Sequence, residues 1–177
     1  ISHQTNCQSS LPRWLNVGFT GHRHLTDDSK LRKGLAVALD SLMKRADQLA
    51  AISSAASGSD TIYQEVAQTR GIIRFVILPF DQETFRKDFD ESQWTRTEPL
   101  IATAIACEVL SGDAERSEAF LDAGMLTVDR SDVMLAYWNG QVAAGKGGTA
   151  DVVAYARRID KPLIIIDGMP ATSIEFQ

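Results

Sequence analysis

Cysteine is scarce in this sequence, because Cys7 and Cys107 are the only two among 177 residues. Cys7 lies in a polar stretch and Cys107 in an apolar one, and the two are too far apart for the short pair spacing of a cysteine metal site. The sequence therefore predicts neither a disulfide framework nor a cysteine-bound metal, and it favours a reducing, cytoplasmic location.

Long apolar runs are also missing. No stretch approaches the roughly 20 apolar residues that a helix needs to cross a bilayer, and no basic segment followed by an apolar one suggests a secretory signal. We therefore expect no membrane partner. The first residue, Ile1, is not a methionine, so we expect a processed chain, a trimmed chain or a piece of a longer one.

An excess of positive charge is the third absence. Lys and Arg number 18 against 23 Asp and Glu, which gives a net charge of −5 at pH 7. Nucleic acids and anionic membranes attract positively charged surfaces. The expectation from net charge is that nucleic acid is not a partner, although a local basic patch stays open.

The sequence does contain an alternation of short apolar runs with segments of helical periodicity. The expected strands are residues 14–19, 49–52, 72–78, 133–138 and 162–166. Their apolar runs are continuous, which is typical of strands buried on both faces, and alternation with helices favours parallel pairing. We predict an α/β fold, namely a Rossmann-like three-layer sandwich with a mostly parallel sheet of about five strands and helices on both faces.

Helices are expected between these strands. The segments are one after Thr26–Asp28, one capped by Asp60, and residues 81–90, 99–106, 114–128 and 149–158. The pattern is least decisive over residues 91–113, where Pro99 is taken as a helix start. Residues 1–13 are polar and patternless and predict a mobile leader, followed by a single domain over 14–177.

Three loops of small residues follow expected strands and precede expected helices. In a parallel sheet such loops lie at the ligand-binding edge, and the first turn of a helix offers unpaired N–H groups to phosphate. The predicted phosphate-binding residues are Thr20, Gly21, His22, Arg23, Ser57, Gly58, Ser59, Lys146, Gly147, Gly148 and Thr149. The alternative for each single loop is a tight turn without a ligand.

Several candidate residues can be interpreted either as ligand-binding or as purely structural. Arg23 is either a bidentate phosphate ligand or a solvated loop residue, and Trp138 either stacks on a base or completes the core. Asn139 is a candidate for the edge of the base. Asp151 either contacts the ribose or base, or only complements the helix dipole. No metal, cofactor or paired nucleophile is expected from the pattern.

Three segments resemble one superfamily. Ser53–Asp60 is similar to the S-G-x-A-x-G-x-D element of Smf-type DNA-processing proteins, and Gly145–Asp151 resembles the P-G-G-x-G-T-x-x-E element of the Lonely Guy phosphoribohydrolases. Val17–Arg23 is similar to the opening strand and loop of the same group. Together they resemble the Rossmann-like SLOG superfamily over residues 15–166.

The resemblance implies three functions. Lonely Guy enzymes cleave the ribose–base bond of nucleoside monophosphates with a motif glutamate, whose position holds Val152 here, and Ala144 replaces the motif proline. The DNA-processing branch binds single-stranded DNA. A sensor branch of bacterial conflict systems recognises nucleotide-derived signals such as ADP-ribose relatives.

The motif match without the glutamate favours the sensor branch, so we expect a nucleotide-derived small molecule as the ligand. Phosphoribohydrolase activity and single-stranded DNA binding are the alternatives. By analogy with relatives we also expect a homodimer through the 114–128 helix, and a fused or partner effector domain.

Overall fold

The computed structural model describes residues 12–25, 27–110, 114–141, 147–166 and 174–175. Most of the expected leader therefore lies outside the described residues. The strands are β1 (Trp14–Gly21), β2 (Gln48–Ser53), β3 (Ile73–Leu78), β4 (Ala106–Val109), β5 (Val133–Tyr137), β6 (Leu163–Ile166) and β7 (Ile174–Glu175). The helices are α1 (Ser29–Met43), α2 (Ser59–Thr69), α3 (Gln82–Arg86), α4 (Glu91–Ala102), α5 (Arg116–Asp129) and α6 (Thr149–Arg158).

The strands form one sheet in the order β4-β3-β2-β1-β5-β6-β7. Every neighbouring pair from β4 to β6 is parallel, and only β7 runs antiparallel to β6. The five predicted strands are all present, and β4 and β7 extend the sheet at its two edges. The chain builds outward from β1 in both directions, so the strand order reverses beside β1 and β5, where a ligand crevice is expected.

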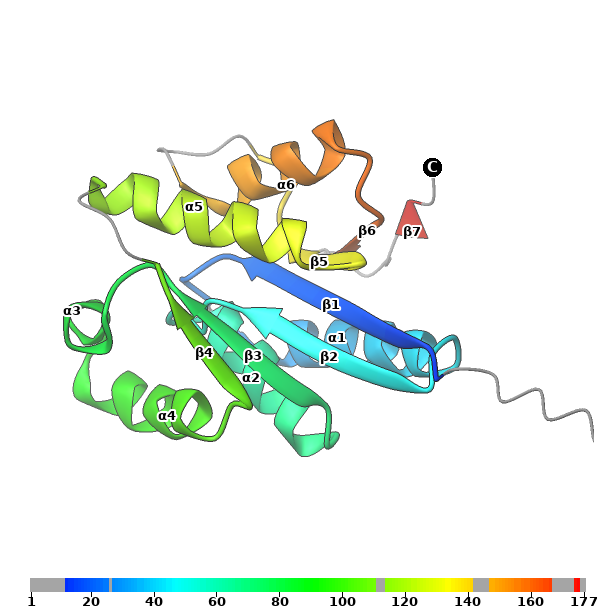
Figure 1. The fold of residues 1–177 in the computed structure, drawn as a ribbon, viewed down its shortest axis with the longest axis horizontal. Coiled ribbons are helices and arrows are strands. Elements are labelled where there is room, and N and C mark those ends of the chain that lie inside the picture. Colours follow the sequence, from blue (N-terminus) through cyan, green and yellow to red (C-terminus); the bar gives the residue numbers. More distant parts are fainter. Residues whose placement is uncertain (1–11, 26, 111–113, 142–146, 167–173, 176–177) are drawn as a thin grey trace, which may run out of the picture.

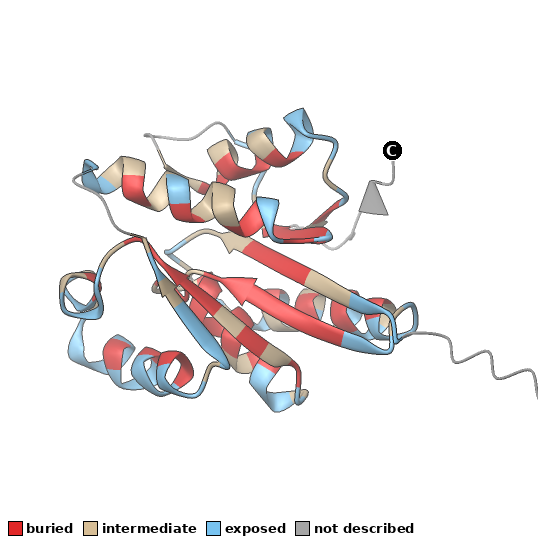
Figure 2. Cartoon of the chain, viewed as in Figure 1, coloured by how far each residue is buried: buried red, intermediate tan, exposed pale blue. Residues whose placement is uncertain are grey.

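Helices cover both faces of this sheet (Figure 1). α5 and α6 lie on one side, and α1 and α2 lie on the other, with α4 packed against α2. The strands between them are largely buried (Figure 2), because apolar side chains fill both layers. Gly124 lets α5 approach α6 closely, since a Cβ there would lie 2.5 Å from a methyl carbon of Val152. The predicted Rossmann-like three-layer sandwich is confirmed.

The segment after α3 differs from the prediction. Residues 99–106 were expected as a helix starting at Pro99, but α4 begins at Glu91 and already contains Pro99. Its start is fixed by a capping box, in which the Asp90 side chain accepts from the Gln93 backbone and the Gln93 side chain accepts from the Asp90 backbone. The chain then turns at Thr103 and enters β4, which pairs with β3.

No helix in the described part of the chain is both long enough and apolar enough to cross a membrane.

Candidate functional site

A cleft lies at the carboxyl edge of the sheet, around a cavity of about 760 Å³. Its walls come from the end of β1, from the loops after β1, β2 and β5, and from helices α2, α5 and α6. The lining residues are Phe19, Thr20, Gly21, His22, Arg23, His24, Ser54, Ala56, Asp60, Arg116, Ser117, Phe120, Gly124, Thr127, Asn139, Gln141, Gly147, Gly148, Thr149, Ala150 and Val152. This is the edge at which the sequence predicted the ligand.

The loop after β1 contributes a guanidinium group to the cleft. The Arg23 guanidinium carbon lies 4.1 Å from the centre of the Phe120 ring, so the cation rests on an aromatic face. Among the described residues, no carboxylate forms an ion pair with Arg23. The group is therefore held in place while its hydrogen-bond donors remain unmatched by any anion of the described chain.

The start of α6 forms another wall. Gly148 is the N-cap residue and offers no side-chain acceptor, so the first turn of the helix has N–H groups without a capping side chain. Gly147 has a φ of +88°, and its N–H donates to Oδ2 of Asp151 over 2.8 Å. Asp151 thus shapes the loop and does not line the cavity. The predicted ligand residue Lys146 lies outside the described residues.

The loop after β2 packs against the loop after β1. The Ser59 N–H donates to the His22 carbonyl over 3.2 Å, and a Cβ on Gly58 would lie 2.1 Å from the Arg23 carbonyl oxygen. Ser57 and Gly58 line a neighbouring cavity of about 420 Å³, which shares Arg23 with the main cleft. Ser59 is fully buried behind Gly21. None of the three predicted residues Ser57, Gly58 and Ser59 therefore lines the main cavity, which this loop reaches through Ser54 and Ala56.

The sequence predicted Asp60 as the cap of the second helix, but it does not occupy the N-cap position of α2. The N-cap of α2 is Gly58, with a φ of +93° that favours glycine, and no side chain caps the helix. Asp60 lies in the first turn, is 6% exposed and lines the cavity. Burial raises the pKa of its carboxyl to about 7, although the Ser54 hydroxyl donates to it and the charge of Arg23 lowers the pKa.

Of the two candidate residues that follow β5, Trp138 and Asn139, only Asn139 lines the cavity. Asn139 lines the cavity, and its backbone N–H donates to Nε2 of His22 over 3.3 Å, which ties this loop to the loop after β1. Trp138 does not line the cavity. Its indole N–H donates to the Gln141 carbonyl over 2.8 Å, and the Arg157 guanidinium lies 5.4 Å from its ring. The interpretation of Trp138 as a packing residue fits this environment.

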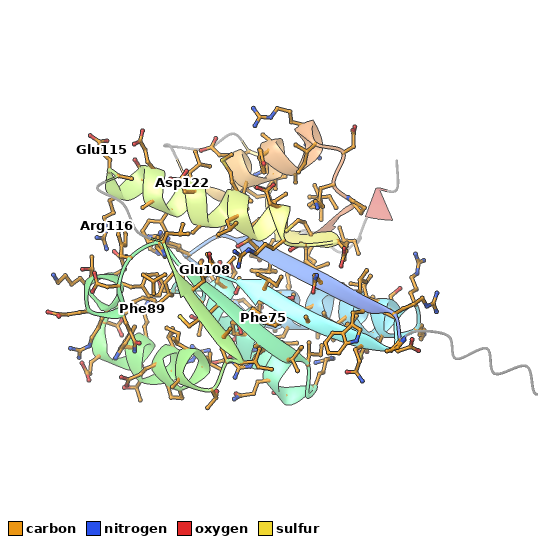
Figure 3. The ribbon with its side chains drawn as sticks, viewed as in Figure 1. Phe75, Phe89, Glu108, Glu115, Arg116 and Asp122 are labelled. Carbon is orange, nitrogen blue, oxygen red and sulfur yellow. The ribbon has the colours of Figure 1, made fainter. Side chains whose placement is uncertain are left out.

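The sequence reasoning missed the contribution of α5. Five residues line the cleft from this helix, for which the sequence predicted a dimer interface, namely Arg116, Ser117, Phe120, Gly124 and Thr127. Arg116 lies at the start of α5 (Figure 3), pairs with Asp88 over 2.5 Å and sits 4.9 Å from the Phe80 ring centre. The signal in the sequence that could have indicated this contribution is the Arg-Ser pair in the first turn of α5, the helix that precedes β5.

Metal ligands do not gather anywhere in the described part of the chain, where no three histidine, cysteine or acidic side chains meet. The cleft therefore carries the cations Arg23 and Arg116, the buried acid Asp60 and the histidines His22 and His24.

Comparison with known proteins gives matches at the level of structure only. No family model matches the sequence, and no curated protein matches it. DNA-processing protein A from Helicobacter pylori, which is described by its single-stranded DNA binding mode, superposes with a TM-score of 0.58 at 22% identity, covering 85% of this chain. DNA-processing protein A from Streptococcus pneumoniae superposes with a TM-score of 0.61 at 13% identity over 92% of this chain.

A third similar structure is the structural-genomics target TM1055, with a TM-score of 0.56 at 16% identity over 84% of this chain. The three likenesses show that this chain shares the Rossmann-like fold of these proteins. This chain spans 64% and 52% of the two DNA-processing proteins and 72% of TM1055. At these identities the likeness establishes the fold alone, so the ligand has to be argued from the cleft.

One expectation needs correction. Net charge predicted that nucleic acid is not a partner, but DNA-processing protein A from H. pylori, which shares this fold, is described by its single-stranded DNA binding mode. The physical reason is that net charge averages over the whole surface, whereas binding depends on the local field. Arg23 places a cation without an ion-pair partner among the described residues at the cleft, although the chain as a whole is acidic.

Proposed function

We propose that the cleft binds a nucleotide through its phosphate group. The observation that carries the proposal is the Arg23 guanidinium, which lies on the Phe120 ring, lines the cavity and has no ion-pair partner among the described carboxylates. Arginine matches phosphate with two parallel hydrogen bonds, and stacking on an aromatic ring leaves its edge free to form them.

The start of α6 supports the same ligand. Its first turn faces the cavity at Gly148 and Thr149, and no side chain caps it. Unpaired N–H groups and the partial positive charge of a helix N-terminus stabilise an anion there. Arg23 and this helix line one cavity, and the proposal is that a single phosphate meets both.

The rest of the cavity suits the remainder of a nucleotide. A volume of about 760 Å³ lies in the range of small-molecule sites. The side chains of Asn139 and Gln141 offer amide groups for polar edges of a base or ribose, and Phe120 offers an aromatic surface.

Single-stranded DNA is a second candidate ligand, favoured by the likeness to DNA-processing protein A from H. pylori. In this case the phosphate belongs to a phosphodiester. The cavity of about 420 Å³ beyond Arg23 then gives the strand room to continue.

Phosphoribohydrolase activity receives less support. Val152 stands at the position of the Lonely Guy motif glutamate, and it is buried beside Gly124. Among the described residues that line the cleft, Asp60 is the only one with a carboxyl group.

Calorimetric titration with AMP, ADP-ribose and a 12-residue oligo-dT tests the proposal and separates its ligands. We expect Arg23→Gln to weaken binding of the preferred ligand at least about tenfold, since hydrogen bonds to charged groups contribute about 1.5–3 kcal/mol. Arg70→Gln is the matched control, because Arg70 pairs with Asp40 at the opposite end of α2.

Tight binding of oligo-dT that weakens steeply with salt would identify the DNA ligand. Unchanged affinity in Arg23→Gln, or no binding of any of the three probes, would overturn the proposed function. Release of free adenine from AMP would instead support phosphoribohydrolase activity.

A further inference from the structure

Asp60 is an acid placed inside a cleft that is otherwise arranged for an anion. It is 6% exposed, lines the main cavity and accepts a hydrogen bond from the Ser54 hydroxyl over 3.1 Å. Within the described chain, no cation lies close enough to form an ion pair with it. A buried carboxylate without a paired cation is unfavourable, so the site favours the neutral carboxylic acid.

The charged groups that face the same cavity come from two elements. Arg23, His22 and His24 belong to the loop after β1, and Arg116 belongs to α5. The charge of Arg23 acts on Asp60 from a distance and favours the carboxylate. An anion bound to Arg23 would cancel this effect, because it would neutralise the cation and add a negative charge near the acid.

The other elements packed around Asp60 supply no further charge to it. In α2, Tyr63 is fully buried and its hydroxyl donates to the Val17 carbonyl, so it stays neutral. From α4, Arg96 is held by Glu65. The residues of α6 in the cavity wall are Thr149, Ala150 and Val152, which are uncharged.

We propose that Asp60 is protonated when the cleft holds its anionic ligand, so that the site takes up a proton together with a phosphate. The inference rests on the proposed function, because it concerns the same cleft and the same anion. Two negative charges in one partly desolvated cavity repel each other strongly, whereas a carboxylic acid adds a hydrogen-bond donor that a phosphate oxygen accepts.

The consequence is a pH-dependent affinity. Because burial raises the pKa of Asp60 to about 7, the acid is largely protonated at pH 6 and largely ionised at pH 8. If only the protonated form binds well, affinity falls roughly tenfold between these two pH values. The site would then bind its ligand more tightly in mildly acidic conditions.

The experiment measures dissociation constants at pH 6 and pH 8 and fixed ionic strength. The probes are ADP-ribose and an oligo-dT without terminal phosphate, whose phosphate charges stay constant over this range. In the unsubstituted protein we expect roughly tenfold weaker binding at pH 8. In Asp60→Asn we expect less than about twofold change, with the pH 6 affinity retained at pH 8.

Histidine protonation gives a dependence of the same sign, so a His22→Gln, His24→Gln double variant is the control. This variant should retain the tenfold change if Asp60 is responsible. Calorimetry at pH 7 in two buffers of different ionisation enthalpy should also show proton uptake that Asp60→Asn abolishes.

Binding that is independent of pH, or a dependence that survives in Asp60→Asn, would overturn the inference while leaving the nucleotide site intact. Failure of both probes to bind at either pH would overturn the site and the inference together.

Discussion

At the scale of single residues, Asp60 shows two opposed effects on one carboxyl. Its position in the first turn of α2 places it near the positive end of the helix, which favours the ionised form. Burial at 6% exposure disfavours that form and is the larger effect, because the pKa is raised from 3.8 to about 7. An acid held in this state is typical of a functional site rather than of a residue selected for stability.

We therefore predict that Asp60 lowers the stability of the free protein as pH rises from about 4 to 7. Over this interval the native state binds a proton that the unfolded state has released, so the free energy of unfolding falls by up to about 1.4 kcal/mol per pH unit. Urea unfolding at pH 5 and pH 8 measures this. Asp60→Asn should be more stable relative to the unsubstituted protein at pH 8 than at pH 5, and an equal difference at both pH values would contradict the prediction.

Gly147 is the residue that permits the close contact of the α6 loop with α5. Its φ is +88°, and a Cβ there would lie 2.3 Å from the Ser117 carbonyl oxygen. We predict that Gly147→Ala costs about 1–3 kcal/mol of unfolding free energy and weakens ligand binding by displacing the loop. Gly71→Ala is the control, because Gly71 has a φ of +66° and open space around it. Equal losses of binding in both variants would refute a specific role for the Gly147 loop.

At the scale of elements, Arg74 attaches α4 to the sheet. It is 5% exposed in β3, and its guanidinium donates to the Leu100 carbonyl over 2.6 Å and to the Thr103 hydroxyl over 2.7 Å. The Leu100 carbonyl is near the end of α4, where helix carbonyls lack intrahelical partners. Arg74 thus satisfies the end of a helix from the neighbouring strand.

Arg74→Leu should lower the unfolding free energy by about 1–3 kcal/mol, because it leaves the buried Leu100 carbonyl without this donor. Arg74→Lys should recover part of this loss, since an ammonium group can still donate to one of the two acceptors. Chemical denaturation of the three proteins measures the order. If the Arg74→Leu variant were as stable as the unsubstituted protein, these hydrogen bonds would make no net contribution to the unfolding free energy.

The elements that could be predicted from sequence are those with strong local patterns. β1, β2, β3, β5 and β6 carry continuous apolar runs, and their parallel pairing follows from alternation with helices. β4 could not be recognised, because Ala106–Val109 is short, lies at the edge beyond β3 and has mostly exposed side chains. The capping box formed by Asp90 and Gln93 is a signal in the sequence for the start of α4, but the prediction took Pro99 as the start and did not use it.

At the scale of the whole molecule, the topology decides where the site lies. The reversal of strand order beside β1 and β5 places Gly21, Arg23, Asn139 and Gly148 around one cavity. This convergence was predictable, because parallel strands bring their carboxyl ends to one edge. The part played by α5 was not, since a crossing helix contributes to a cleft only through the three-dimensional packing that places it there.

The central claim is that Arg23 and the start of α6 hold one phosphate at this edge. The most direct test is a two-dimensional ¹⁵N–¹H NMR titration with ADP-ribose and with oligo-dT at pH 6. We predict that the backbone amides of Gly21, Gly148 and Thr149 and the side-chain Nε–H of Arg23 shift together, with a single dissociation constant for the bound ligand. Saturable shifts confined to another surface, with these four signals unchanged, would contradict the claim.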